Sequence, residues 1–157
     1  MANELTTLGI TLNYAYEASS GVRPTTNYTK IAGIKATPDL SVAPAGIDVT
    51  DLEEDFARKY LPGLRDFGDD LAFTANLTST LVTDWASLVS TAATKWASGL
   101  ATWFEIKIPG LGKSYYFSGM PSALGVSALN VNEAAETECH IAPNGFHGFD
   151  APSTIVT

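Results

Sequence analysis

The stretch LAFTANLTSTLVTDWASLVSTAATKWASG, residues 71–99, changes its apolar period once, and that change decides the expected fold. Over residues 71–77 apolar and polar side chains alternate, which is typical of a strand with one buried face. From Leu81 onward apolar residues recur at steps of three and four, which predicts an amphipathic helix over about residues 80–98. A strand followed directly by a helix indicates that the helix folds back onto a sheet.

The helix carries a single apolar stripe, so it must lie against a sheet or a neighbouring chain. The predicted packing face consists of Leu81, Trp85, Leu88, Ala92 and Trp96. Ser79 or Thr80 is expected to cap the first amides, because hydroxyl side chains accept hydrogen bonds from them. Gly99 is the residue type expected just after the last turn.

Further strands are predicted on both sides of the helix, from alternating apolar and polar residues and from Gly- and Pro-rich breaks. Gly33 weakens one of them, and residues 109–112 form a short loop that indicates a hairpin. These strands cover residues 8–17, 28–37, 102–108, 113–118, 125–131 and 136–141. The chain, residues 1–157, is therefore expected to be a single, mainly β domain, a β-sandwich or partial barrel of short antiparallel strands with one flanking helix.

One long segment, about residues 38–68, shows no strand pattern and is expected to be a loop. From Asp48 to Asp70 the chain holds eight acidic and three basic residues, interspersed with apolar ones. Structureless loops of this length are uncommon in compact domains and tend to be functional. Two interpretations remain open: a solvated loop with a short helix around Leu52 to Tyr60, or a docking arm that becomes ordered against a partner.

Composition excludes several classes of protein. Of the 157 residues 45% are hydrophobic and 17% charged, and the formal charge is -8. A general nucleic-acid binder needs a basic face, which this balance does not supply. The single cysteine cannot form an intramolecular disulfide, and no stretch approaches the roughly 18 consecutive apolar residues of a membrane span. The start of the chain lacks the basic and apolar regions of a signal peptide, so we expect synthesis in the cytoplasm.

No motif indicates catalysis, a cofactor or a bound metal. Gly112-Lys113-Ser114 imitates the end of a phosphate-binding loop, but Lys107 stands where that motif needs glycine, and a strand is expected next. Cys139 and His140 are neighbours on a predicted strand and point to opposite faces, so they cannot share a metal. A G-x-S-x-G nucleophile motif is absent. The protein is therefore expected not to be an enzyme and to carry no cofactor.

Several short sequence segments resemble the major tail tube protein of long-tailed, non-contractile bacteriophages. The likeness covers nearly the whole chain, and one departure is Ser41-Val42, where the family commonly has a glycine-containing turn. The start of the long loop is therefore expected to differ in shape from the family's. The segments are LGITLNY at residues 8–14, TPDL at 37–40, IDVTDL at 47–52, YLPGLRD at 60–66 and LAFT at 71–74.

This resemblance implies a structural virion protein, a single tail-tube domain that forms rings of six copies. The rings would stack into the hollow tail tube through which DNA passes during ejection, without tight binding. Partners would be other copies of the chain and tail proteins such as the tape measure, tail tip and terminator. Assembly would take place in the host cytoplasm, the tube would end in the virion tail, and no membrane would be involved.

The resemblance also implies that the long loop bridges adjacent rings. The residues expected to do so are Pro44, Ile47, Asp48, Asp51, Glu53, Glu54, Phe56, Arg58, Lys59 and Tyr60. Glu136 and Glu138 share one face of the last predicted strand, in a region without Lys or Arg, and are expected to face the channel. An acidic face exposed to solvent is the other interpretation of these two residues. The rival function is a carbohydrate- or protein-binding β-sandwich module of a tail tip or fibre.

Overall fold

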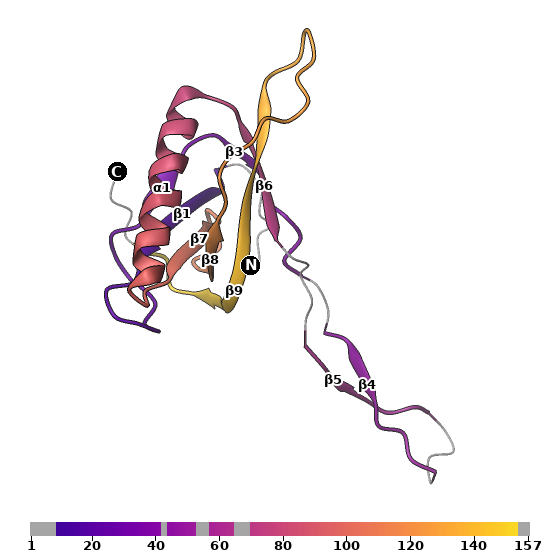
Figure 1. Cartoon of the computed structure of the whole chain (residues 1–157). Coiled ribbons are helices and arrows are strands. Elements are labelled where there is room, and N and C mark those ends of the chain that lie inside the picture. Colours follow the sequence, from indigo (N-terminus) through magenta and orange to yellow (C-terminus); the bar gives the residue numbers. More distant parts are fainter. Residues whose placement is uncertain (1–8, 42–43, 53–56, 65–69, 154–157) are drawn as a thin grey trace.

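A computed structural model describes residues 9–41, 44–52, 57–64 and 70–153. It contains one helix, a seven-stranded sheet and a separate pair of short strands (Figure 1). The elements are β1 (Thr11–Tyr16), β2 (Thr29–Ile31), β3 (Ile34–Ala36), β4 (Gly46–Asp48), β5 (Tyr60–Pro62), β6 (Leu71–Asn76), α1 (Ser79–Ala97), β7 (Thr102–Lys107), β8 (Ser114–Pro121) and β9 (Glu136–Asp150).

The seven-stranded sheet is a nearly closed barrel. Its order is β2-β1-β7-β8-β9-β6-β3, and every neighbouring pair is antiparallel. The two edge strands, β2 and β3, follow each other in the chain, so one short segment runs from one edge of the sheet to the other. Gly33 makes this turn at a φ of +85°, a conformation open to glycine, and its carbonyl accepts the Asn76 amide at 2.9 Å. Of the two expected architectures the chain adopts the partial barrel, because one sheet curves instead of two sheets stacking.

The main core lies between α1 and one face of the curved sheet. The helix contributes four buried side chains, Leu81, Trp85, Leu88 and Ala92. The sheet supplies Leu12, Ile31, Leu71, Phe73, Ala75, Phe104, Ile106, Phe117, Cys139 and Ile141. The rings of Phe104 and Phe117 stack at 5.4 Å between centroids, and burial of such rings dominates core energetics.

Trp96 corrects the predicted packing face, because 52% of its surface is exposed. At 3.6 residues per turn it lies about 60° around the helix from Leu81, at the border of the buried stripe. It also belongs to the last turn, since α1 ends at Ala97. The helix packing face in this chain therefore stops at Ala92.

The helix ends are set by residues outside the helix. Thr78, not Ser79 or Thr80, is the N-cap, and its hydroxyl accepts the Leu81 amide at 3.2 Å. Gly99 follows the last turn, as predicted, with a φ of +79° and its amide donating to the Trp96 carbonyl at 2.9 Å.

Other predicted segments change when the chain folds. Residues 28–37 divide into β2 and β3 at the Gly33 turn, and residues 125–131 form no strand. The strand predicted over 136–141 continues to Asp150 as β9, long enough to pair with both β6 and β8. The 113–118 segment follows a turn and becomes β8, which confirms the hairpin with β7.

Candidate assembly surfaces

The long loop contains a β-hairpin arm, here defined as residues 44–64, of which 44–52 and 57–64 are described. β4 and β5 pair antiparallel within it, with Ile47 opposite Leu61. The Val49 amide extends the ladder to the Lys59 carbonyl at 3.0 Å. The arm projects well away from the barrel (Figure 1). The expected short helix over residues 52–60 is wrong for the described part, because residues 57–59 form no helix and Tyr60 begins β5.

Local contacts hold the two strands of the arm together. The Thr50 hydroxyl accepts the Lys59 amide at 2.8 Å, and the Thr50 amide donates to Asp48 Oδ1 at 2.9 Å. The hydrogen bonds from the Thr50 side chain and backbone lower the pKa of the Asp48 carboxyl. Gly63 allows the strands to approach, since a Cβ there would lie 2.7 Å from the Ala45 carbonyl oxygen.

The arm exposes apolar side chains that nothing in the described chain covers. Ile47 and Leu61 are each 54% exposed, and Tyr60 and Leu64 are also exposed. A two-stranded hairpin is only marginally stable alone in water. The arm therefore has the composition of a segment that is completed by contact with another surface.

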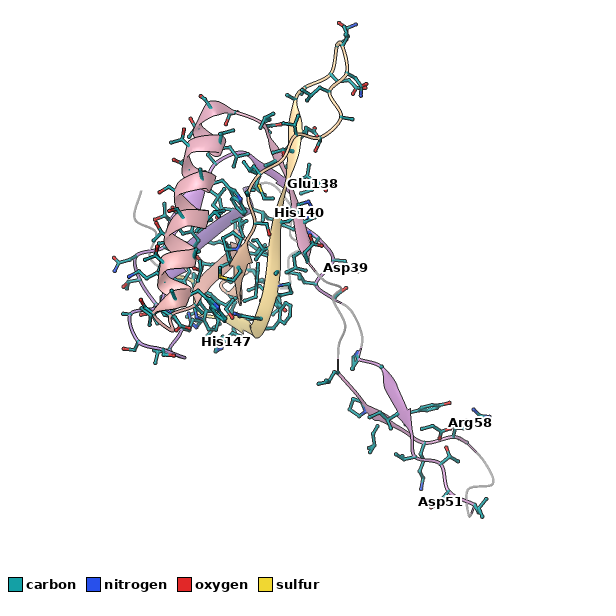
Figure 2. The ribbon with its side chains drawn as sticks, viewed as in Figure 1. Asp39, Asp51, Arg58, Glu138, His140 and His147 are labelled. Atoms are coloured by element: carbon teal, nitrogen blue, oxygen red, sulfur yellow. The ribbon has the colours of Figure 1, made fainter. Side chains whose placement is uncertain are left out.

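The residues expected to bridge rings can now be placed. Glu53, Glu54 and Phe56 lie outside the described residues. Pro44 is half-buried at the start of the arm, and Arg58 and Asp51 lie near its far end (Figure 2). The described members of the set all belong to the arm: Pro44, Ile47, Asp48, Asp51, Arg58, Lys59 and Tyr60.

A second projection, the 122–135 loop, connects β8 to β9. Its two ends are fixed to the barrel: Trp85 Nε1 donates to the Ser122 carbonyl at 2.6 Å, and the Leu77 amide donates to the Ala135 carbonyl at 3.0 Å. The Thr137 hydroxyl also donates to the Gly125 carbonyl at 3.0 Å. The middle of the loop stands out from the barrel at the end opposite the arm (Figure 1).

The 122–135 loop is apolar, exposed and almost uncharged. Val126 is 74% exposed, Leu129 is exposed as well, and Val131 is 88% exposed. Glu133 is its only charged residue. The sequence pattern placed a strand over residues 125–131, but β8 already has β7 and β9 on its two sides, so it cannot pair with a further strand there.

An acidic face follows β9 on the side away from the helix (Figure 2). Glu136, Glu138 and His140 alternate there with buried residues. Glu136 forms an ion pair with Lys35. His140 lies between two carboxylates, with Nδ1 2.6 Å from Asp70 and Nε2 3.5 Å from Glu138. Next to them, Glu133, Glu136 and Glu138 line an open groove of about 540 Å³.

The sheet face away from the helix also buries a carboxylate, Glu105, which sequence reasoning did not single out. Its side chain has no exposed surface. Asn13 Nδ2 donates to it at 3.0 Å, the Ser153 amide at 3.0 Å and the Ser153 hydroxyl at 2.5 Å. The Tyr116 hydroxyl lies 2.9 Å from Glu105 Oε2. Burial by itself raises the pKa of Glu105, but the donors from Ser153 and Asn13 outweigh it and leave that pKa lowered.

This cluster fastens the segment after β9 across the barrel wall. Lys107 Nζ donates to the Ser153 carbonyl at 3.3 Å, and the Tyr116 hydroxyl lies 2.5 Å from the Ala151 carbonyl. Arg23 pairs with Asp150 at 2.9 Å and lies 4.2 Å from the centre of the Tyr116 ring. The sequence shows only that Glu105 shares one face of a predicted strand with Trp103 and Lys107. It does not show which segment would cover the Glu105 side chain.

Comparison with solved structures gives matches to particles of known architecture. One chain in a cryo-EM structure of the anti-feeding prophage baseplate, 6-fold symmetrised, aligns with a TM-score of 0.62 and 12% identity, covering 94% of this chain and 97% of the other. A chain in the tail of an empty gene transfer agent particle, with C6 symmetry, aligns with a TM-score of 0.50 and 20% identity, covering 80% and 87%. A chain of the native gene transfer agent virion aligns at 0.50 and 23%, covering 79% and 89%. This chain shares their fold.

No protein-family model and no curated protein matches the sequence. Among the described residues, no helix combines the length and the apolar content that crossing a membrane requires. The same residues bring together no group of three or more His, Cys, Asp and Glu side chains placed to hold a metal ion.

Proposed function

We propose that this chain is a structural subunit of a phage-like tail, whose copies form six-membered rings that stack into a hollow tube. The shared fold supports this proposal, because the matched chains come from a baseplate and a tail described as six-fold symmetric. The chain's role is then mechanical, with no catalytic step and no cofactor.

The arm is the observation that carries the proposal. It projects from the barrel, is held together by its own ladder, and exposes Ile47 and Leu61 to solvent. Such a segment is suited to reach a neighbouring subunit and to bury these side chains there. We assign it the contact between adjacent rings, and Asp51, Arg58, Lys59 and Tyr60 belong to that contact.

Contacts within a ring are supported by the sheet edges. β2 and β3 are both three-residue strands at the edges of the barrel sheet. Edge strands present unpaired backbone groups that can be covered by a partner. The low charged fraction, 17% of the chain, also suits a protein that buries much of its surface between copies.

The tube is proposed as a conduit for DNA, with Glu136 and Glu138 facing the channel. A negative wall gains no counterion-release energy from phosphates, so DNA would slide through it without tight binding. The tape measure, tail tip and terminator proteins are the further partners proposed, and the virion tail is the proposed location, after assembly in the host cytoplasm.

Negative-stain microscopy of the purified chain tests the proposal directly. We expect rings, and tubes at higher concentration. A variant in which a short Gly-Ser linker replaces residues 44–64 should form rings but no tubes, because the inter-ring contact is gone. Its thermal transition should remain cooperative and near that of the parent chain, since the arm lies outside the main core.

Strictly monomeric particles at every concentration would contradict the proposal. That result would favour a protein-binding module of a tail tip or fibre, for which one surface is available. An apolar groove of about 800 Å³ lies at the root of the arm, lined by Leu40, Ile108, Tyr115, Phe146 and Phe149 among others.

A further inference from the structure

We propose that the 122–135 loop is the docking surface for the arm of a second copy of this chain in the adjoining ring. This inference rests on the proposed function, because it names the surface that receives the arm. It assigns a role to a segment that the sequence pattern placed in a strand.

The positions of the two projections support this assignment. The arm and the 122–135 loop leave the barrel at opposite ends (Figure 1). A chain with this shape cannot bring its own arm to its own loop. When copies stack in the same orientation, however, the arm end of each copy faces the loop end of the next, which is a head-to-tail contact.

The chemistry of the two surfaces is matched. The arm presents Ile47, Leu61 and Leu64, and the loop presents Val126, Leu129 and Val131, all of them exposed. Contiguous exposed apolar residues on a folded chain mark sites of protein contact. Packing the two sets against each other would remove both from water.

The distribution of charge also favours contact between the arm and the 122–135 loop. The chain carries a formal charge of -8, and the segment that contains the arm is rich in Asp and Glu. Most of the barrel surface would therefore repel it. Residues 114–132 contain no charged residue, and Glu133 is the one charge of the 122–135 loop, so the part of the loop that carries Val126, Leu129 and Val131 is a neutral surface on an acidic molecule. An acidic arm that packs on this part of the loop meets no like charge within residues 122–132.

The loop is also held in place before any contact. Trp85 and Leu77 donate hydrogen bonds to the carbonyls at its two ends, and the Thr137 hydroxyl donates to the Gly125 carbonyl. A receiving surface that is already ordered loses less conformational entropy on binding than a mobile one. The ordering cost then falls mainly on the arm.

Aspartate substitutions in the loop test the proposal. Leu129→Asp and Val131→Asp should each raise the concentration needed for tubes by about tenfold or more, because apolar burial is lost and a like charge is added. Val22→Asp is the matched control, since Val22 is an exposed valine in another turn and is 59% exposed. It should assemble as the parent chain does. Rings and thermal transitions should be unchanged in both loop variants.

Chemical cross-linking gives a second, direct readout. Leu61→Cys in the arm and Leu129→Cys in the loop are combined in one chain and treated with a short bismaleimide. Cys139 does not compete, because it is buried and burial raises its pKa to about 11. Assembled tubes of the double variant should give a ladder of cross-linked copies, whereas either single variant should remain monomeric on a denaturing gel.

The outcomes separate the two proposals. If the parent chain forms tubes but the loop variants form them at the same concentration, or the double variant gives no ladder, the docking surface is overturned and the tube function stands. If the parent chain forms no rings or tubes, the proposed function fails and this inference fails with it. If a loop variant loses its cooperative transition, Val131→Ser replaces it and the same comparison of tube concentrations decides.

Discussion

At the scale of single residues, Glu105 shows how a charge can be buried without being paired to a cation. An ionised carboxylate in a low-dielectric interior is costly unless its lone pairs are filled. Here Asn13, Tyr116 and two groups of Ser153 surround it. The same bonds fix the segment after β9, so a single carboxylate joins the barrel wall to the last described residues.

Replacing Glu105 by glutamine should destabilise the protein by about 2–3 kcal/mol. The amide has almost the same shape, but it is neutral and turns an NH₂ group toward the Asn13 and Ser153 donors, and hydrogen bonds to charged groups are worth more than neutral ones. Denaturant unfolding measures the difference. Glu133→Gln is the control, because Glu133 is an exposed carboxylate, and this change should stay within about 0.5 kcal/mol. Equal effects of the two substitutions would contradict this account.

Stability should also fall in acid. The pKa of Glu105 is lowered in the folded chain, and the His147 contact, together with the Ala151 amide and Arg23, lowers that of Asp150 to about 2. Carboxyls with a lowered pKa stabilise the fold above their unfolded pKa, about 4, and lose this contribution as the pH falls through the folded value. Thermal unfolding from pH 7 to pH 2 measures the effect. Asp150→Asn should be less stable than the parent chain at pH 7, and the gap should shrink as the pH falls from about 4 toward 2; a gap that is constant with pH would count against this account.

At the scale of elements, sequence patterns succeeded where contacts are local. The helix over about 80–98 was predictable because its three- and four-residue period depends only on its own side chains, and α1 spans Ser79–Ala97. The β7–β8 hairpin was predictable because a Gly- and Pro-containing turn joins two strand-forming runs. In both cases the interacting partners lie close together in the chain.

The failures concern partners that lie far apart in the chain. Residues 125–131 were predicted as a strand, but β8 and β9, which flank them in the chain, already have partners on both sides, and β9 becomes long because both β6 and β8 pair with it. β4 and β5 each have only three residues, too few for a period to be recognised. Glu105 depends on Ser153, 48 residues further along the chain. Such pairings are decided by the whole sheet, so a local pattern cannot specify them.

At the scale of the whole molecule, the barrel is nearly closed, and two projections extend away from it. Closure leaves β2 and β3 as short edges, which limits uncontrolled strand pairing. The arm and the 122–135 loop extend the molecule in opposite directions (Figure 1). A rigid centre with complementary ends fits assembly by repetition, in which each copy completes its neighbour.

The proposed channel face gives the last prediction. If Glu138 lines the channel, a cysteine placed there and labelled with a small gold-cluster maleimide should give density along the tube axis in electron micrographs. Cys139 is buried and should not react. Asp84→Cys is the matched control, because Asp84 is exposed on α1, whereas Glu138 lies on the side of β9 away from that helix. It should label the outer wall or a subunit contact instead.

Glu138→Cys and Asp84→Cys each remove one carboxylate, so the two variants differ equally in charge from the parent chain. A difference in where their gold labels appear therefore reports the positions of the two residues. Glu138 has His140 as its neighbour and is about half exposed, so the substitution leaves the core residues of β9 untouched. Gold density on the outer wall from Glu138→Cys would place the acidic face in solvent. The barrel would then have to present a different surface to the channel, and DNA passage would have to rely on groups other than these carboxylates.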